Sequence, residues 1–298
     1  MVPAMSDPIF VEVRRNAHIE ARHRVHAVAV RGGEIVASAG DPNLVCFMRS
    51  SSKPFQALPL VRARDDLAED EIAIACASHR DTPEQVEAAR KLLAHAGATE
   101  DDLELGLEKC RPPQKIHHNC SGKHAGMLAL CDVKGWERKG YHLPDHPVQV
   151  GCREAHVEAA EVEPLAAAAD GCGVVTFAFP LERMAHAFSR LESRPGGDRI
   201  ASAMRARPDL VGGPDGVDFL LMRDAPGWLA KGGAEGLLCA AGPDGIGVAL
   251  KSEDGSSRPH APALAAFLDR LGVAVPSLTE VPVTNSRGER VGLIALRR

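Results

Sequence analysis

Residues 25–38 read VHAVAVRGGEIVAS. Two runs with strand-like alternation, 25–30 and 34–38, are separated by Arg31, Gly32 and Gly33. A period of two is typical of β-strands, and a short glycine-containing connection between two such runs is typical of a hairpin. Because a hairpin joins antiparallel strands, this stretch predicts a largely antiparallel sheet.

Further strand patterns lie toward both ends of the chain. They are residues 10–13 (FVEV), 236–241 (GLLCAA), 246–250 (IGVAL) and 291–296 (VGLIAL). No strand pattern is sustained between the two ends. We therefore expect one sheet, built from about 8–40 and 228–298.

The middle of the chain, about 50–220, has mostly helical spacing of apolar residues. Helices are predicted near residues 53–65, 83–97, 121–131, 147–161, 180–192 and 197–206, and one more near 261–271. No linker interrupts the 298 residues. We expect a single domain over 1–298 with an α/β fold, α+β in the strict sense, in which the helices pack against the sheet.

Composition excludes several classes of protein. Apolar residues make up 45% of the chain, which is typical of globular proteins, and the net charge of −5 argues against nucleic-acid partners and anionic membrane surfaces. No apolar run approaches the roughly 18 residues of a membrane span. The first residues lack a secretory pattern, so we expect a cytoplasmic protein.

Cysteine usage fits that compartment. We expect reduced thiols at the eight cysteines, because the chain is long and shows no export signal. They are Cys46, Cys76, Cys110, Cys120, Cys131, Cys152, Cys172 and Cys239. No CxxC pair occurs, which excludes a zinc ribbon or finger.

The first candidate for chemistry is RSSSKPFQ at residues 49–56. Ser50 and Lys53 are three positions apart and share one face of a helical turn. A lysine amine with a lowered pKa can act as the base for a serine hydroxyl. Pro54 places Ser50 at the start of the helix. The alternative is a serine-rich helix cap that matches the pattern by chance.

The second candidate is NCSGKH at residues 119–124, which precedes the apolar run 125–130. Polar groups crowded at a helix start are suited to binding an anion or a substrate. The alternative is an Asn or Ser cap beside a buried cysteine.

Three shorter motifs are weaker when taken singly. They are CASH at 76–79, DGCG at 170–173 and KGGAEG at 231–236. A capped buried cysteine, a tight turn and a solvated loop are the respective alternatives.

Together these segments, with Ala21-Arg22-His23 and Arg207-Pro208, resemble the bacterial asparaginases of the thermolabile, rhizobial type. That asparaginase II family is similar in fold to serine β-lactamases and serine-dependent glutaminases. The resemblance extends over nearly the whole chain. It implies a serine β-lactamase-like fold and an L-asparagine amidohydrolase.

The resemblance also implies roles for particular residues. The catalytic set is Ser50, Lys53, Ser78 and Lys231, in which Ser50 pairs with Lys53 and Ser78 pairs with Lys231, or with Lys251 as a fallback. The substrate-binding set is Arg49, Asn119, His124, Asp170 and Gly232. The ligands of a modulating zinc ion are Cys120, Lys123 and Cys172.

One departure from the family pattern is visible. Arg80-Asp81-Thr82 follows His79 where a smaller residue and then an acidic one are expected. We therefore expect altered contacts to the substrate at this position.

The expected reaction is hydrolysis of L-asparagine to L-aspartate and ammonia, by a homodimer as the family suggests. A glutaminase or another Ser-Lys hydrolase is the first alternative, and a protein that binds zinc or an amino acid without turnover is the second.

Overall fold

The structure, a computed structural model, describes residues 7–107 and 113–297. Cys110 lies outside the described residues. The described strands are β1 (Ile9–Arg15), β2 (His18–Arg31), β3 (Glu34–Ala39), β4 (Val45–Phe47), β5 (Ala166–Ala169), β6 (Val175–Pro180), β7 (Leu229–Gly233), β8 (Leu237–Gly242), β9 (Ile246–Ser252), β10 (Glu280–Thr284) and β11 (Arg290–Leu296). The described helices are α1 (Lys53–Ala63), α2 (Glu69–Ala75), α3 (Pro83–His95), α4 (Ser121–Lys134), α5 (Pro147–Ala160), α6 (Leu181–Ser189), α7 (Gly197–Ala206), α8 (Pro208–Gly212), α9 (Val217–Asp224) and α10 (His260–Asp269).

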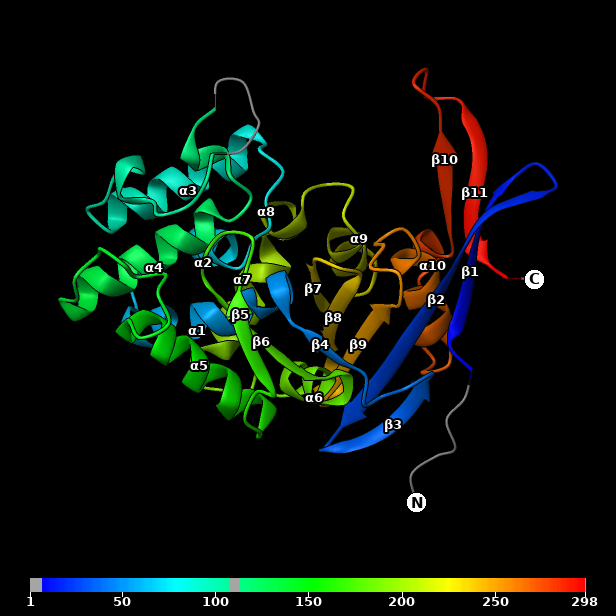
Figure 1. The fold of residues 1–298 in the computed structure, drawn as a ribbon, viewed down its shortest axis with the longest axis horizontal. Helices are drawn as coiled ribbons and strands as arrows, with labels where there is room; N and C mark the ends of the chain where they lie inside the picture. Colours follow the sequence, from blue (N-terminus) through cyan, green and yellow to red (C-terminus); the bar gives the residue numbers. More distant parts are fainter. Residues whose placement is uncertain (1–6, 108–112, 298) are drawn as a thin grey trace.

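The main sheet has eight strands in the order β10-β11-β1-β2-β9-β8-β7, and β3 pairs with β2. All of its pairings are antiparallel, as the hairpin pattern predicts. The expectation that strands from both ends of the chain share one sheet is confirmed, because β2 pairs with β9 and β1 pairs with β11. Strands β1 and β11, near the two ends of the described chain, therefore lie side by side (Figure 1).

Both faces of the central strands are buried. Along β2, Val28 and Val30 face the core that includes the helical region, whereas Ala27 and Ala29 face a second core under α10. Because successive side chains of a strand point to opposite faces, this explains the unbroken buried run at 25–30. Helix α6 packs on β2, β8 and β9 so closely that a Cβ atom at Gly247 would lie 1.9 Å from the Ala185 carbonyl oxygen.

Helices α1–α5, α7 and α8 form a separate layer beside the sheet, with α1 packed against α4, α5 and α7, and α2 packed against α3, α4, α7 and α8 (Figure 1). The predicted helices in this region are confirmed to within a few residues. Pro54 and Pro83 lie in the first turns of α1 and α3, where the missing N–H has no intrahelical partner to lose.

Several elements were not predicted from the sequence. The middle region contains a second antiparallel sheet in the order β4-β6-β5, so the expectation of no sustained strand there is wrong. β5 is the alanine run 166–169, whose residues are exposed and show no alternation. The short helices α2, α8 and α9 each span eight residues or fewer, too few for a clear helical period. No helix within the described ranges is both long enough and apolar enough to cross a membrane.

Candidate active site

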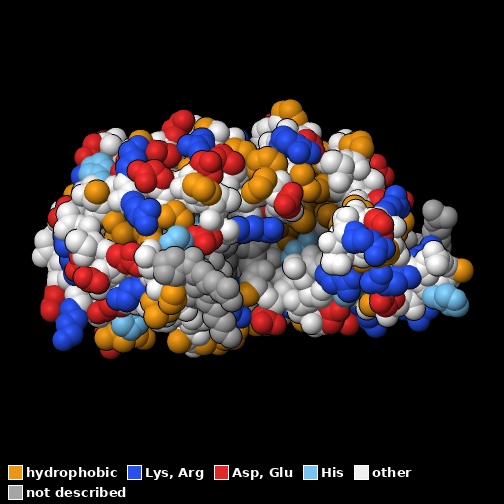
Figure 2. All heavy atoms as spheres, turned by 90° about the horizontal axis from the view of Figure 1, so that it is seen from above, with side chains coloured by type: hydrophobic (Ala, Val, Ile, Leu, Met, Phe, Trp, Pro, Cys, Tyr) orange, Lys and Arg blue, Asp and Glu red, His pale blue; other side chains and the backbone are white. Residues whose placement is uncertain are grey.

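A cleft of about 580 Å³ lies where the helical layer meets the β7 edge of the main sheet. Figure 2 shows this face hollowed near its middle. Five of the predicted site residues line the cleft: Ser50, Ser78, Asn119, Lys231 and Gly232. They come from positions far apart in the chain, so the fold brings together four of the motifs that the sequence singled out.

The amine of Lys53 lies beneath this cleft. The side chain extends from the first residue of α1, is 1% exposed, and donates a hydrogen bond to Ser78 Oγ at 2.9 Å. It also donates to the carbonyl oxygens of Ala77 and Asn119. The hydroxyl in contact with the amine is therefore that of Ser78, rather than that of Ser50, its neighbour in the sequence.

Ser50 occupies a short 3-10 helix, Arg49–Ser52, that leads directly into α1. The preceding residue, Arg49, has a φ of 48°, in the left-handed region that non-glycine residues rarely adopt. The Arg49 N–H donates to Thr176 Oγ1 at 3.0 Å, and its side chain donates to Asp170 Oδ1 at 2.6 Å. These contacts hold the strained backbone beside Ser50 in place.

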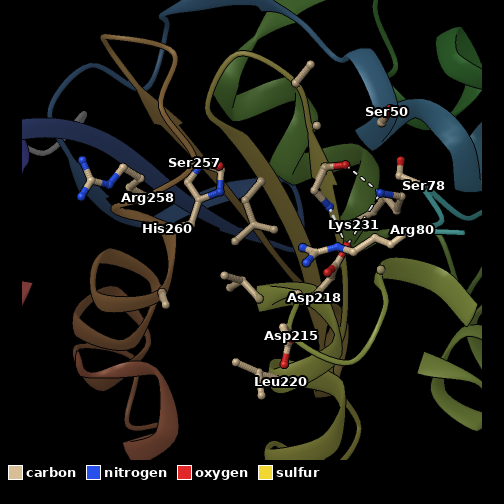
Figure 3. A pocket seen from close by; sticks show the side chains of 18 of the residues that line it. Ser50, Ser78, Arg80, Asp215, Asp218, Leu220, Lys231, Ser257, Arg258 and His260 are labelled. Atoms are coloured by element: carbon tan, nitrogen blue, oxygen red, sulfur yellow. Dashed lines mark hydrogen bonds and ion pairs between the residues drawn. The ribbon is translucent and has the colours of Figure 1, made fainter. Parts of the chain in front are cut away.

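Lys231 reaches the cleft from the edge strand β7. Its side chain is 1% exposed, and Nζ donates to the carbonyl oxygen of Gly232 at 2.7 Å. The Lys231 carbonyl in turn accepts a hydrogen bond from Ser51 Oγ at 2.8 Å, which ties β7 to the 3-10 helix that carries Ser50. Figure 3 shows the Lys231 side chain directed toward the wall that carries Ser50 and Ser78.

The fallback lysine is placed differently. Lys251 Nζ donates to the carbonyl oxygens of Glu235 and Ser252, and Lys251 does not line the cleft. Of the two lysines, Lys231 is the one whose amine is available to a group in the cleft.

Both cleft lysines have lowered pKa values because they are buried. Desolvation is the largest cause for Lys53, where the charge of Lys123 adds to it and Cys120 opposes it. Desolvation also lowers the pKa of Lys231 to about 8, with Lys53 adding to the effect and Asp218 opposing it. A buried ammonium loses its hydration, so burial favours the neutral amine more than it is favoured in an exposed lysine.

The three predicted zinc ligands converge behind Lys53. Cys120 lies just before α4, and Lys123 Nζ donates to Cys172 Sγ at 2.9 Å. A hydrogen bond from Cys172 is the main reason that the pKa of Cys120 lies well below its ordinary value. The two buried sulfur donors fit the preferences of zinc, whereas the Lys123 amine is an unusual ligand that must lose its proton to bind. Within the described residues, no group of three or more His, Cys, Asp or Glu side chains could hold a metal ion.

Three predicted substrate-binding residues lie outside the residues that line the cleft: Arg49, Asp170 and His124. Arg49 and Asp170 bind each other, as described above. His124 is fully buried, and its Nδ1 lies 2.6 Å from the Tyr141 hydroxyl. Arg49 and Asp170 thus support the backbone beside Ser50, whereas the His124 side chain is hydrogen-bonded to Tyr141 and, among the residues that the structure describes, to none that lines the cleft.

Two residues that sequence reasoning did not assign to the site also line the cleft. Asp218 comes from α9, a helix without a clear sequence pattern, and it lies 3.7 Å from Lys231 Nζ. Arg80 is exposed, and Figure 3 shows its side chain extending into the cleft. The departure from the family pattern after His79 was the one signal that pointed to Arg80.

Comparison with known proteins gives one family and several distant folds. A sequence model described as L-asparaginase II matches residues 11–296. Among solved structures, Mglu in its native form is 15% identical, with 85% of this chain and 66% of that chain covered and a TM-score of 0.40. A beta-lactamase from Mycobacterium bovis is 14% identical, with 78% of this chain and 88% of that chain covered and a TM-score of 0.33.

The chain spans just under two thirds of the Mglu chain, at 66% of its length. No curated protein gave a significant match. The family match, in contrast, covers nearly the whole chain and includes every motif that lines the cleft. This protein therefore belongs to the L-asparaginase II family.

Proposed function

We propose that this protein hydrolyses the side-chain amide of L-asparagine to L-aspartate and ammonia, with a serine as nucleophile and a lysine as its base. The observation that carries the proposal is the buried Lys53 amine, 2.9 Å from Ser78 Oγ at a cleft that Ser50 and Lys231 also line. A free serine hydroxyl is a weak nucleophile, and an adjacent base activates it.

In the first half of the proposed reaction, Ser50 Oγ attacks the carbonyl carbon of the amide. Its proton passes to Ser78 Oγ, which passes its own proton to neutral Lys53. The tetrahedral intermediate carries a negative oxygen, and backbone N–H groups of Ser50 and of the strand that carries Lys231 are the donors we assign to it.

In the second half, Lys231 donates a proton through Ser78 to the amide nitrogen. The C–N bond then breaks and the nitrogen leaves as ammonia. An ester between aspartate and the serine remains. Water adds to that ester and its proton returns to Lys231, Ser50 recovers its proton from Lys53 through Ser78, and aspartate is released. In the alternative order Ser78 attacks with Lys53 as its direct base, because the two are in contact, and Ser50 relays the proton to the departing nitrogen.

The charge of the cleft supports an amino-acid amide as substrate. Within residues 7–107 and 113–297, no hydrogen bond or ion pair engages the Arg80 guanidinium. A guanidinium that points into a cleft can bind a carboxylate with two parallel hydrogen bonds. We assign the α-carboxylate of the substrate to Arg80.

We further propose that Cys120, Lys123 and Cys172 hold zinc. When bound, zinc would act as a Lewis acid that anchors a charged end of the substrate. Lys123 donates a hydrogen bond to Cys172. Desolvation lowers the pKa of Lys123, but the interactions with Cys120 and Cys172 outweigh it, so the pKa is raised. Zinc binding must therefore displace a proton from Lys123, which makes zinc affinity increase with pH.

The decisive experiment measures ammonia release from L-asparagine and from L-glutamine, with and without a chelator. The proposal predicts faster release from asparagine. Faster release from glutamine would assign a glutaminase, and no release from either would leave a binding protein without turnover.

The nucleophile is assigned by mass spectrometry of the protein quenched during turnover. We expect an aspartyl adduct located on Ser50 in the wild-type protein and absent from Ser50→Ala. An adduct on Ser78 would establish the alternative order.

A further inference from the structure

A buried carboxylate faces the Lys231 amine from a helix that no motif marks. Asp218 lies in the first turn of α9, and its side chain is 10% exposed. Oδ2 accepts a hydrogen bond from the Gly232 N–H at 3.3 Å and lies 3.7 Å from Lys231 Nζ. Oδ1 accepts from the Phe219 N–H at 3.2 Å. Figure 3 shows Asp218 next to Lys231 beside the cleft.

The Asp218 carboxylate occupies space that exists because two neighbouring residues, Gly212 and Gly216, have no side chain. A Cβ atom at Gly212 would lie 2.1 Å from Asp218 Oδ1, and one at Gly216 would lie 2.4 Å from the same oxygen. Any larger residue at either position would displace the carboxylate from Lys231. Two glycines and two backbone N–H groups thus hold the acid in one orientation.

We propose that Asp218 is the positioning residue that fixes the Lys231 amine and keeps it protonated as the proton donor to the departing ammonia. The proposal rests on the proposed function, because it concerns one step of that reaction. Asp218 acts through Lys231 and need not touch the reacting bond.

The charges around Lys231 make Asp218 the residue that decides its protonation. Lys53 faces it from α1, Cys76 from the end of α2, Cys120 from the start of α4 and Asp218 from α9. Burial and the Lys53 charge favour the neutral amine, and Asp218 is the largest influence in the opposite direction. Without Asp218, Lys231 loses its proton at a lower pH.

The test is the pH profile of kcat/KM for ammonia release from L-asparagine by wild type and Asp218→Asn. If protonated Lys231 is the donor, activity falls as pH rises through its pKa. We expect this basic limb to move to lower pH by roughly one pH unit in Asp218→Asn, which is a roughly tenfold loss at pH 9. KM at pH 6 should stay unchanged. The control is Asp224→Asn, which removes a charge from the same helix at a carboxylate bound to Arg223 and Ser277.

A second variant tests the same role by rescue. In Asp218→Ala the carboxylate is replaced by space that opens on the cleft, so sodium formate should restore activity and sodium chloride at equal ionic strength should not. A basic limb of Asp218→Asn that coincides with wild type, or equal effects of formate and chloride, would overturn the proposal. Absence of ammonia release by wild type would instead refute the proposed function.

Discussion

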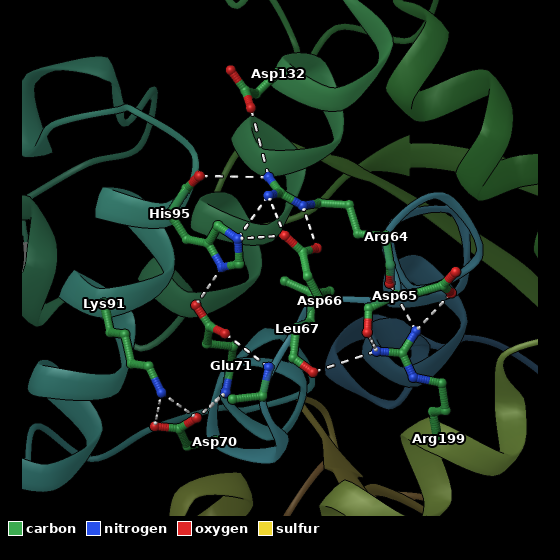
Figure 4. A network of polar contacts seen from close by, with 11 residues as sticks. Arg64, Asp65, Asp66, Leu67, Asp70, Glu71, Lys91, His95, Asp132 and Arg199 are labelled. Atoms are coloured by element: carbon green, nitrogen blue, oxygen red, sulfur yellow. Dashed lines mark hydrogen bonds and ion pairs between the residues drawn. The ribbon is translucent and has the colours of Figure 1, made fainter.

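Ionisable side chains gather in two regions of this protein, the cleft and a network that joins the end of α1 to α2, α3 and α4 (Figure 4). In the network, Arg64 donates two hydrogen bonds to Asp66, at 3.0 and 2.9 Å, and His95 Nδ1 lies 2.9 Å from Glu71 Oε1. Each charge has an opposite partner. In the cleft, Lys53 donates to a hydroxyl and to two carbonyl groups.

Folding shifts the pKa values of basic groups in opposite directions in the two regions. Pairing with Glu71 and Asp66 raises the pKa of His95 despite some desolvation and the nearby Arg64, so folding favours its charged form. Desolvation lowers the pKa of Lys53 and Lys231, so folding opposes their charged forms. The charges of the network therefore stabilise the fold. Burial of the two cleft amines costs stability, but it gives them pKa values that allow proton exchange.

The largest expected effect comes from removing the buried amine. Lys53→Met should lower kcat for ammonia release by roughly 10²–10⁴-fold, the usual contribution of a general base. Its melting temperature should equal or exceed that of wild type, because a buried amine whose charged form is disfavoured by desolvation is replaced by an apolar side chain of similar size. Lys91→Met, at an exposed ion pair with Asp70, is the control and should keep full activity. Retained activity in Lys53→Met would contradict the assignment of the base.

Metal content should distinguish the cysteines within the helical layer. We expect purified protein to contain zinc and Cys120→Ala to lose it, because the remaining donors are one thiol and one amine. The control is Cys131→Ala, at another buried cysteine of α4, which should retain zinc. Equal zinc in all three proteins, measured by elemental analysis, would exclude the site.

A smaller effect is expected at the open side of the cleft. Arg80→Gln should raise KM for L-asparagine by roughly tenfold to a hundredfold, which corresponds to the loss of a charge-assisted hydrogen bond. The kcat value should change little, since the guanidinium is assigned to binding. Arg90→Gln, at an exposed arginine of α3, should leave both constants unchanged. A change in kcat alone would place Arg80 in a different role.

The smallest effect concerns the network. The pKa of His95 is higher in the folded protein than its ordinary value of about 6.5, so its charge stabilises the fold fully below that pH. This contribution disappears as pH rises through the raised pKa. We expect His95→Gln to melt below wild type at pH 5.5 and to match it at pH 9, as followed by circular dichroism. His18→Gln, at an exposed position of β2, should show no such dependence. An equal difference at both pH values would mean that packing, and not charge, explains the effect.

Local patterns were sufficient for much of the fold. Alternation at 25–30 predicted β2, and Pro54 and Pro83 marked the starts of α1 and α3. The second sheet could not be predicted, because the exposed alanines of β5 carry no period and their pairing with β6 is a tertiary contact. Strand β7 also lacked a pattern, since two of its five residues are glycines.

For the site, the sequence by itself determined the residue types and their local spacing: Ser50 within one turn of Lys53, and the motifs around Ser78, Asn119 and Lys231. Only the tertiary structure decided that Lys53 contacts Ser78, and that Asp218 faces Lys231 from another element. The physical reason is the distance along the chain over which each effect acts. Spacing along a helix sets neighbours a few residues apart, whereas desolvation of an amine and the charge opposite it depend on segments that meet only when the chain folds.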